Sequence, residues 1–493
     1  MRPVLTVAEM READASALQR VSQSTLVARA GTAVALGALR MLGAGYGHRV
    51  VVVAGKGNNG ADGRVAASVL RRRGARVTMV PAADPGRLPA CDLVIDAAYG
   101  TGFRGTYEAP RVPVGARVLA VDIPSGVDGD TGAAAGSPMA AARTVTFAAL
   151  KPGLLQGDGP RLAGRVEVAD IGIDVGSPGI ALVEDADVPA VLPRRPPESH
   201  KWTTAVAVVA GSPGMEGAAS LSARGASHGG AGMVRLAVPG SEPADGSPPA
   251  DAGPWPLEAV RLPVGRAGWA PEVLPVLGRC RALVVGPGLG RDDTTQAEVR
   301  RLVGASPVPV VADADALVAL GDVARTRELV AATPGRPVVL TPHDGEFRAL
   351  AGHPPGPDRV AAVRDLAART GAIVLLKGSL TAVALPPGLL ATGEPDVLLA
   401  AAGSSRLATA GTGDVLSGVI GAFIARGAPA PLATALAAHV HGRAAGLGPA
   451  EGLVAGDLPE LVAAWLSRTM SEGPGPGDGR RTVPAPPAGG RDG

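Results

Sequence analysis

Short apolar runs alternate with helical patterns along most of the chain. Residues 7–42 have helical spacing with few breakers and predict one or two helices, and residues 63–74 predict another. In the first part of the chain, apolar runs predict strands at 49–55, 75–80, 92–98, 117–126, 143–150 and 165–173. Strands that alternate with helices form parallel β-α-β units, so we expect an α/β domain.

The same alternation restarts beyond the proline-rich segment 187–199. Helical patterns at 413–427 and 431–446 close this second part, and its further apolar runs predict strands at 204–211, 281–286, 308–315, 337–343, 372–378 and 381–385. We therefore predict two three-layer αβα domains with a proline-rich linker between them, at residues 1–190, 191–199 and 200–470. Segments rich in glycine and proline predict a surface loop at 239–256 and a disordered tail at 471–493.

Composition narrows the class of protein. Of 493 residues, 46% are hydrophobic but only 2% aromatic, so the cores must be mainly aliphatic. The net charge of +2, with mixed signs along the chain, argues against a nucleic-acid partner. Cys91 and Cys280 lie far apart in the sequence, which argues against a disulfide framework and favours a reducing compartment. Without a signal peptide or an uninterrupted apolar stretch of roughly 18 residues, we expect a cytoplasmic protein without a membrane span.

The turn GKGNNGADG at 55–63 follows the first predicted strand and matches the pattern G-x-G-x-x-G. A strand, a glycine-rich turn and a helix present backbone N–H groups to an anion, as in dinucleotide-binding folds. The usual acidic residue at the end of the second strand is missing, because Pro81 lies there and Asp84 comes late. Asp62 would also repel a pyrophosphate. The pattern alone is therefore weak support for a conventional NAD site.

Oxygen-bearing side chains follow three predicted strands of this domain. Asn58, Asn59 and Asp62 follow the first, while Asp96 and Asp122 follow two others. The carboxyl ends of the strands line the ligand crevice of a doubly wound sheet, so Asn59, Asp96, Asp122 and Ser125 could converge in one polar pocket. Hard cations bind such oxygen ligands. A helix N-cap or a turn would explain each residue separately.

Four motifs in this domain, GNNGADG, DAAYGTGFRG, DIPSGVDGDTG and TFAALKPGLL, resemble those of the NAD(P)H-hydrate epimerases in order and spacing. The resemblance covers about residues 5–180 and implies a Rossmann-like domain. It implies a potassium ion bound by Asn59, Asp96 and Ser125, with Asp122 as the acid/base group. The implied substrate-binding residues are Asn58, Asn59, Gly60, Ala61, Asp62, Gly100, Thr101, Gly102, Phe103, Arg104, Gly105, Thr106 and Asp122. Ala61 stands where the family more often has glycine, which matters only if that position needs a positive φ.

The stretch ATAGTGDVLSG at 408–418 is the most informative one in the second domain. A glycine-rich turn that opens an apolar helix forms an anion site through its amides and the helix dipole. Asp414 in the first helical turn could accept a hydroxyl proton during phosphoryl transfer. Alternatively, its negative charge could simply interact favourably with the positive end of the helix dipole. Lys377 follows a predicted strand and could contact phosphate, or it could be a solvated loop lysine. His343, at another strand end, could be structural.

The motifs HK, AGSPGMEGAASLSARGA, GPGLG, DADAL, TPHDGE, LKGSLT and GTGDVLSG resemble the ADP-dependent NAD(P)H-hydrate dehydratases, which have a ribokinase-like fold. The match covers about residues 198–467. It implies that the substrate contacts Ala218, Gly288, His343 and Asp414. It implies that the nucleotide contacts Lys377, Gly378, Ser379, Leu380, Thr381 and Gly413. Trp202 and Ala410 stand where the family usually has glycine, and Ala410 would narrow the nucleotide turn.

Together the resemblances imply a bifunctional enzyme of nicotinamide nucleotide repair. The first domain would interconvert the R and S epimers of hydrated NADH or NADPH (NADHX, NADPHX). The second would dehydrate the S epimer with ADP, releasing AMP and phosphate, and phosphoryl transfer would require Mg²⁺. We also expect a homo-oligomer. The alternatives are a ribokinase-like small-molecule kinase in the second domain and a nucleotide-sensing module in the first.

Overall fold

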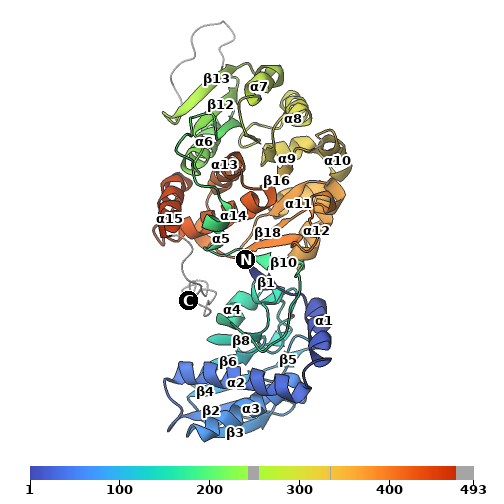
Figure 1. The fold of residues 1–493 in the computed structure, drawn as a ribbon, viewed down its shortest axis with the longest axis vertical. Coiled ribbons are helices and arrows are strands. Elements are labelled where there is room, and N and C mark those ends of the chain that lie inside the picture. Colours follow the sequence, from blue (N-terminus) through green and yellow to red (C-terminus); the bar gives the residue numbers. More distant parts are fainter. Residues whose placement is uncertain (242–254, 334, 473–493) are drawn as a thin grey trace. The chain divides into compact units, whose positions relative to one another are not determined.

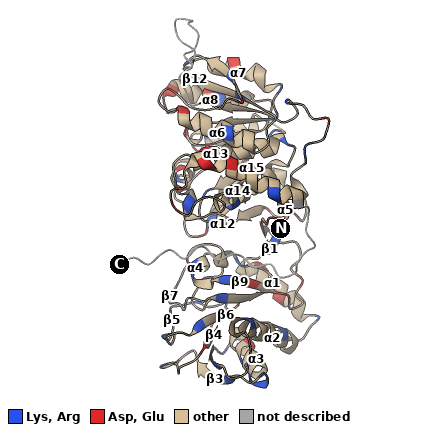
Figure 2. Cartoon of the chain, turned by 90° about the vertical axis from the view of Figure 1, so that its left-hand side faces the viewer, with Lys and Arg blue, Asp and Glu red and all other residues tan. Residues whose placement is uncertain are grey.

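The computed structural model describes residues 1–241, 255–333 and 335–472 (Figure 1). The chain divides into two compact units, one within Arg2–Gly179 and the other beginning at Ile180. Residues 242–254 of the predicted surface loop and residues 473–493 of the predicted tail lie outside the described residues. Acidic and basic residues are interspersed along both units (Figure 2), as the net charge of +2 suggests.

The N-terminal unit contains a parallel six-stranded sheet. The strands are β2 (Arg49–Ala54), β3 (Arg76–Pro81), β4 (Leu93–Ala97), β6 (Arg117–Val121), β8 (Arg143–Phe147) and β9 (Arg165–Ala169), and each lies where an apolar run predicted one. The order β3-β2-β4-β6-β8-β9 reverses between β2 and β4. Such a switch point opens a crevice at the carboxyl ends of these two strands.

Helices cover one face of this sheet. The remaining elements of the unit are β1 (Arg2–Val4), α1 (Val7–Leu18), α2 (Gln23–Leu42), α3 (Asn58–Arg72), β5 (Tyr107–Glu108), β7 (Gly136–Ser137) and α4 (Gly159–Ala163). Val50 and Val52 of β2 pack in one core with α2 and α3, which lie beside each other (Figure 1). Val51 and Val53 point to the opposite face, as strand geometry requires, and pack on segments that connect the strands.

Helix α2 begins after the N-cap Ser22 and ends at Gly43, whose φ of 82° suits a helix end. Among the described residues it is the one helix that is long and apolar enough to cross a membrane by length and composition. Its buried residues, such as Val34 and Ala38, belong to the core that covers the sheet. The apolar character of α2 is therefore accounted for by packing within the unit.

The C-terminal unit has a larger, mixed sheet. Its strands are β10 (Ile180–Leu182), β11 (Ala205–Val209), β12 (Met233–Pro239), β13 (Ala259–Val264), β14 (Ala282–Val285), β15 (Val310–Ala312), β16 (Val338–Leu340), β17 (Ile373–Leu376), β18 (Thr381–Ala384) and β19 (Val397–Ala400). They follow the order β10-β19-β18-β17-β16-β15-β14-β11-β12-β13. Only the pairs of β18 with β17 and β19 are antiparallel among those described here. The order reverses between β11 and β14, and a switch point of this kind is where doubly wound sheets bind their ligands.

Helices cover both faces of this sheet, as predicted (Figure 1). Alternate residues such as Val206 and Val208 face the core formed with α6, α13, α14 and α15, while Ala205 and Ala207 are buried on the other face. The helices are α5 (Asp187–Val191), α6 (Glu216–His228), α7 (Trp269–Leu277), α8 (Asp293–Ala305), α9 (Asp315–Leu320), α10 (Val323–Ala331), α11 (Asp344–Ala351), α12 (Arg359–Thr370), α13 (Thr412–Ala425), α14 (Ala430–Ala445) and α15 (Leu458–Glu472). The α/β class of both domains is confirmed, but in the N-terminal unit the described helices cover one face of the sheet and not both, as the three-layer prediction required.

The boundary between the units lies earlier than the sequence pattern predicts. Residues 180–190 were assigned to the first domain, but β10 pairs with β19 of the second sheet. Val188 of α5 and Leu192 belong to the core of the second unit. A three-residue strand and a five-residue helix give too little periodicity to be recognised, so the proline-rich segment 187–199, at whose end the linker was predicted, begins with an ordered helix.

Candidate active sites

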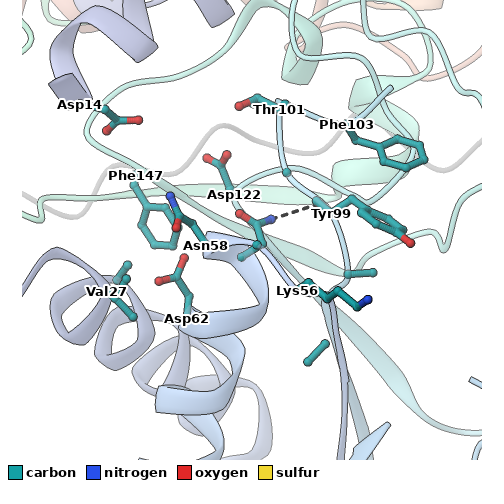
Figure 3. A pocket seen from close by; sticks show the side chains of 18 of the residues that line it. Asp14, Val27, Lys56, Asn58, Asp62, Tyr99, Thr101, Phe103, Asp122 and Phe147 are labelled. Carbon is teal, nitrogen blue, oxygen red and sulfur yellow. Dashed lines mark hydrogen bonds between the residues drawn. The ribbon is translucent and has the colours of Figure 1, made fainter. Parts of the chain in front are cut away.

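A large cavity opens at the switch point of the N-terminal sheet (Figure 3). Its volume of about 1160 Å³ is sufficient for a dinucleotide. Of the residues that the sequence predicted for the first substrate, nine line it: Asn58, Asn59, Asp62, Gly100, Thr101, Gly102, Phe103, Arg104 and Asp122. Gly60, Ala61, Gly105 and Thr106 are not among its lining residues.

Residues 58–62 form the first turn of helix α3, whereas the sequence pattern predicted a loop followed by a helix at residue 63. The helix begins at Asn58 after Gly57, so its free N–H groups and the positive end of its dipole lie at the cavity. Ala61 lies inside this helix and is not among the residues with positive φ. A methyl group is therefore compatible with the backbone at that position.

The Asn59 side chain connects the carboxyl ends of two strands. Its Nδ2 donates to the carbonyl oxygens of Tyr99, 3.1 Å away, and Val121, 2.8 Å away. A Cβ atom on Gly100 would lie 2.6 Å from Asn59 Oδ1, so only glycine at position 100 leaves room for the Asn59 side-chain amide. Asn59 therefore holds the turn after β4 against the end of β6.

Asp96 and Ser125 lie beneath this turn and are fully buried. Ser125 donates to Asp96 through its Oγ at 2.6 Å and its backbone N–H at 2.9 Å. The Ser125 hydroxyl also lies within hydrogen-bond distance of the backbone of Tyr99, the residue that Asn59 contacts. Burial raises the pKa of Asp96. In the part of the chain that the structure describes, this carboxyl is in contact with hydrogen-bond donors and with no cationic side chain.

Asp122 lies at the floor of the cavity in a strained backbone conformation. Its φ of 66° is in the left-handed region, which non-glycine residues rarely adopt. Its Oδ1 accepts hydrogen bonds from Lys151 Nζ at 2.7 Å and from Thr146 Oγ1 at 3.0 Å. Lys151 is only 1% exposed and was not predicted as a site residue, although it lies within the quoted motif TFAALKPGLL.

Two further carboxyl groups of the cavity have raised pKa values. Burial, together with the charge of Asp122, raises the pKa of Asp62 to about 8. Burial also raises the pKa of Asp14, a lining residue that the sequence did not indicate. With a pKa of about 8, Asp62 is mostly protonated at neutral pH, so the repulsion of a pyrophosphate expected from the sequence is largely removed. A protonated acid and a lysine-paired carboxylate in one cavity are suited to acid/base chemistry.

The candidate site of the C-terminal unit lies at the N-terminus of helix α13. Gly411, with a φ of 89°, precedes this helix, and Gly413 and Asp414 lie in its first turn. A Cβ atom on Gly413 would lie 3.3 Å from Lys377 Nζ, so the predicted lysine does reach this helix end. Burial and the charge of Asp313 raise the pKa of Asp414 to about 7.

Lys377 begins the tight turn between the antiparallel strands β17 and β18. Its backbone is held on both sides, because its N–H donates to Pro342 at 2.9 Å and its carbonyl accepts from Arg359 at 2.7 Å. Gly378 and Ser379 lie in the turn and Thr381 begins β18, while the Leu380 side chain is 1% exposed and belongs to the core. Leu380 can therefore offer a ligand only its backbone.

Ala218 and Gly288 come together at the switch point of this sheet. A Cβ atom on Gly288 would lie 2.9 Å from that of Ala218, and the φ of 64° at Gly288 suits a residue without a side chain. His343 has a structural role, one of the two alternatives that the sequence left open. It caps helix α11, since its Nδ1 accepts from the N–H groups of Gly345 and Glu346 at 3.0 and 3.1 Å. Only its Nε2 remains for a ligand.

Both units thus combine a sheet with a switch point, a helix N-terminus and a buried carboxyl group, an arrangement typical of α/β enzymes that act on phosphate-bearing ligands. A family model described as NAD(P)H-hydrate dehydratase matches residues 206–468. A second, described as YjeF-related protein N-terminus, matches residues 23–89 and 80–153. The chain belongs to the family of bifunctional NAD(P)H-hydrate repair enzymes.

Similar proteins match both units. The bifunctional NAD(P)H-hydrate repair enzyme Nnr of Mycobacterium tuberculosis is 40% identical over 467 residues, which cover 88% of this chain and 92% of the relative. The enzyme of the same name from Salinibacter ruber is 35% identical, with 96% of this chain and 97% of the relative covered. A solved structure of the ADP/ATP-dependent NAD(P)H-hydrate dehydratase from Bacillus subtilis, co-crystallised with ATP/Mg²⁺, is 28% identical with a TM-score of 0.46, and it covers 58% of this chain and 97% of that chain.

Proposed function

We propose that the protein repairs hydrated nicotinamide nucleotides through two independent sites. The N-terminal unit interconverts the R and S epimers of NAD(P)HX, and the C-terminal unit dehydrates the S epimer with ADP to give NAD(P)H, AMP and phosphate. The observation that carries the proposal is the pair of carboxyl groups, Asp122 in the N-terminal cavity and Asp414 in the first turn of α13, each with helix N–H groups nearby. Membership of the repair family supplies the substrate.

In the N-terminal site, we assign to Asp122 the role of the acid/base group at the epimerising carbon. The ion pair with Lys151 keeps its carboxylate in one orientation, and the left-handed backbone directs it into the cavity. The amides of residues 100–104 and of the first turn of α3 would bind the phosphates of the dinucleotide. The protonated Asp62 could lie beside those phosphates without repulsion.

The residues predicted to hold potassium fit such an ion. Asp96 is a buried carboxyl group without a cationic partner among the described residues. The Ser125 hydroxyl contacts both Asp96 and the carbonyl oxygen of Tyr99, to which Asn59 Nδ2 also donates. A cation bound there would compensate the charge of Asp96 and fix the turn after β4. No catalytic step is assigned to it.

Exchanging K⁺ for tetramethylammonium should therefore slow R-to-S conversion and lower the thermal unfolding midpoint, because Asp96 would lose its counter-ion. The dehydration of pure S epimer should be unaffected. Asp96→Asn should show no response of the unfolding midpoint to K⁺. An unfolding midpoint of the wild-type protein that is the same in both salts would contradict this assignment.

In the C-terminal site, the hydroxyl of the S epimer attacks the β-phosphorus of ADP while Asp414 accepts its proton. The phosphoryl group moves to the hydroxyl oxygen and AMP leaves. The carbon–oxygen bond then breaks with loss of phosphate, the neighbouring ring carbon loses a proton so that the ring double bond forms, and NAD(P)H is released. The amides at Gly413 and the ammonium group of Lys377 would stabilise the charge on the moving phosphoryl group.

Mg²⁺ would neutralise the phosphates of the nucleotide during this transfer. Among the described residues, no group of three or more His, Cys, Asp or Glu side chains is placed to bind a metal ion. We therefore propose that the ion binds mainly through the nucleotide phosphates, and we assign no residue to it. Mg²⁺ commonly binds in this way at phosphoryl-transfer sites.

The decisive experiment adds purified protein, ADP and Mg²⁺ to separately prepared R and S epimers and records NADH absorbance. Recovery from S should be immediate, and recovery from R should pass through the epimerase. A ribokinase-like small-molecule kinase would give no absorbance change even with fresh S epimer, which would overturn the proposal. We place this activity in the cytoplasm and in a homo-oligomer, which fractionation and light scattering can test.

A further inference from the structure

Asp313, in the motif DADAL, was not assigned a role by the sequence and is held in an unusual position. It follows β15, and the next residue, Ala314, has a φ of 51°, which is strained for a residue with a side chain. A Cβ atom on Gly286 would lie 1.8 Å from the Asp313 carbonyl oxygen, so β14 and β15 approach closely at this point. This backbone places the Asp313 carboxylate against α13 with an exposed fraction of 1%.

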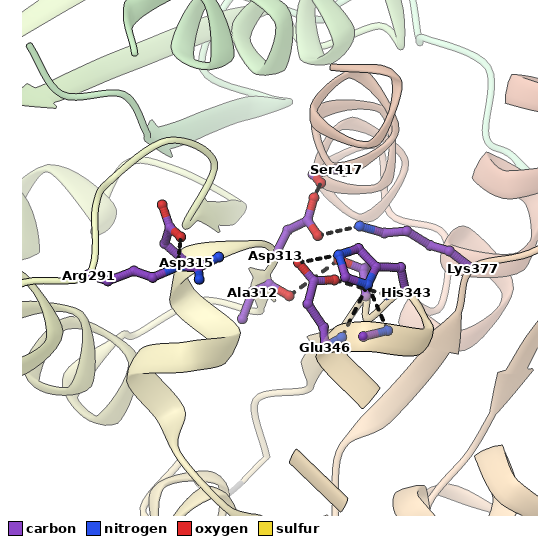
Figure 4. Close-up of polar contacts among 10 residues, drawn as sticks. Arg291, Ala312, Asp313, Asp315, His343, Glu346, Lys377 and Ser417 are labelled. Atoms are coloured by element: carbon purple, nitrogen blue, oxygen red, sulfur yellow. Dashed lines mark hydrogen bonds and ion pairs between the residues drawn. The ribbon is translucent and has the colours of Figure 1, made fainter. Parts of the chain in front are cut away.

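Both oxygen atoms of this carboxylate are engaged (Figure 4). Its Oδ1 accepts a hydrogen bond from Lys377 Nζ at 2.6 Å, and its Oδ2 accepts one from the Ser417 hydroxyl one turn after Gly413. Lys377 comes from the end of β17, and Ser417 lies on α13. One buried side chain therefore connects three elements at the candidate phosphoryl-transfer site.

We infer that Asp313 is a positioning residue of the dehydratase, which holds the Lys377 ammonium group at the N-terminus of α13 and away from Asp414. Burial and two bonded oxygen atoms prevent Asp313 from reaching a substrate itself. Without this anchor, Lys377 would pair with Asp414, and both groups would be lost to the reaction. The inference rests on the proposed dehydratase function.

The charges around Asp414 agree with this arrangement. Burial is the largest cause of the raised pKa of Asp414. The charged groups that face Asp414 come from the ends of two strands and from α9 and α11, and they are Asp313, Lys377, Asp315 and Glu346. His441 of α14 is also near Lys377, but burial lowers the pKa of this histidine to about 4, so it is neutral. The negative charge of Asp313 therefore raises the pKa of Asp414, while its hydrogen bond keeps the nearest positive charge in place.

The test is Asp313→Asn in the full-length protein, assayed with ADP and S epimer over a range of pH. We expect kcat/KM to fall roughly tenfold to a hundredfold. The acid limb of the pH profile should move down by about one unit, because a like charge beside Asp414 is removed. In a Lys377→Met background the same substitution should cost much less, since the group that Asp313 positions is absent. Ser417→Ala should produce a smaller loss in the same direction.

Asp365→Asn is the matched control, because it removes the surface ion pair with Arg369 at 3.0 Å and should change neither rate nor profile. The epimerase rate and the unfolding midpoint report whether each variant is folded. If Asp313→Asn does not fold, the same measurements on Ser417→Ala test the inference in its place. A pH profile that does not shift in Asp313→Asn would overturn the inference. So would a double variant in which Asp313→Asn lowers kcat/KM by the same factor in the Lys377→Met background as in the wild-type protein.

Binding of ADP, measured by calorimetry, separates this inference from the proposed function. If the wild-type protein binds ADP but recovers no NADH, the proposed function fails while the role of Asp313 is still tested. Asp313→Asn should then weaken ADP binding roughly tenfold, and unchanged binding would overturn the inference. Wild-type protein that binds no ADP would overturn both.

Discussion

Asp414→Asn should lower the rate of ADP-dependent NAD(P)H recovery from the S epimer by roughly 10²–10⁴-fold. Asparagine has nearly the same shape but cannot accept the hydroxyl proton. Asp414 lies in the first turn of α13, so the neutral side chain should leave the helix intact. R-to-S conversion, measured by separating the epimers chromatographically, should continue at the wild-type rate, because it takes place in the other unit.

The pH profile provides the second half of this prediction. Burial and the charge of Asp313 raise the pKa of Asp414 to about 7, well above the usual range of an aspartate. The group acts as a base only when ionised, so wild-type kcat/KM should increase with pH through about 7 and level off above it. A base with an ordinary aspartate pKa would instead be ionised throughout this range. A flat profile from pH 6 to 8 would contradict the role assigned to Asp414.

The fold was largely predictable because its strands are apolar runs between clear turn signals, such as RVVVVA before Gly55. The strand β18 was predicted at 381–385, and its antiparallel direction could also have been recognised from the sequence. Only Lys377 to Leu380 connect it to β17, and a parallel connection needs a crossover of a dozen residues or more. Strand β10 could not have been recognised, because three residues are too few to show an alternating pattern, and its partner β19 lies more than 200 residues away in the sequence.

Site residues could be predicted where a sequence motif contains the reactive groups. They could not be predicted where an unusual backbone conformation determines which side chain reaches the site. DADAL contains two aspartates, and only the positive φ of Ala314 shows that Asp313 is the one that meets Lys377. Lys151 likewise follows Ala148, whose φ of 60° redirects the chain after β8. The cap formed by His343 had a signal, since Glu346 stands three residues later as in a capping box.

Asp122→Asn should abolish R-to-S conversion and leave the dehydration of S epimer intact. Asparagine tolerates the left-handed backbone at residue 122 better than alanine does, so it tests the chemistry with little added strain. The loss should be roughly 10²–10⁴-fold. A control without enzyme corrects for spontaneous epimerisation, and Asp170→Asn, an exposed turn residue of the same unit, is the matched substitution.

The buried ion pair allows stability and chemistry to be separated at this site. Asp122→Ala leaves the Lys151 ammonium buried without its carboxylate, which should destabilise the N-terminal unit by roughly 3–5 kcal/mol. Adding Lys151→Met should recover much of that stability, because no unpaired charge remains, but it should not recover activity. Thermal unfolding measures the first effect and the epimer ratio the second. If the Asp122→Ala, Lys151→Met double variant converts R to S at the wild-type rate, Asp122 holds the fold together and another group, such as Asp62 or Asp14, moves the proton.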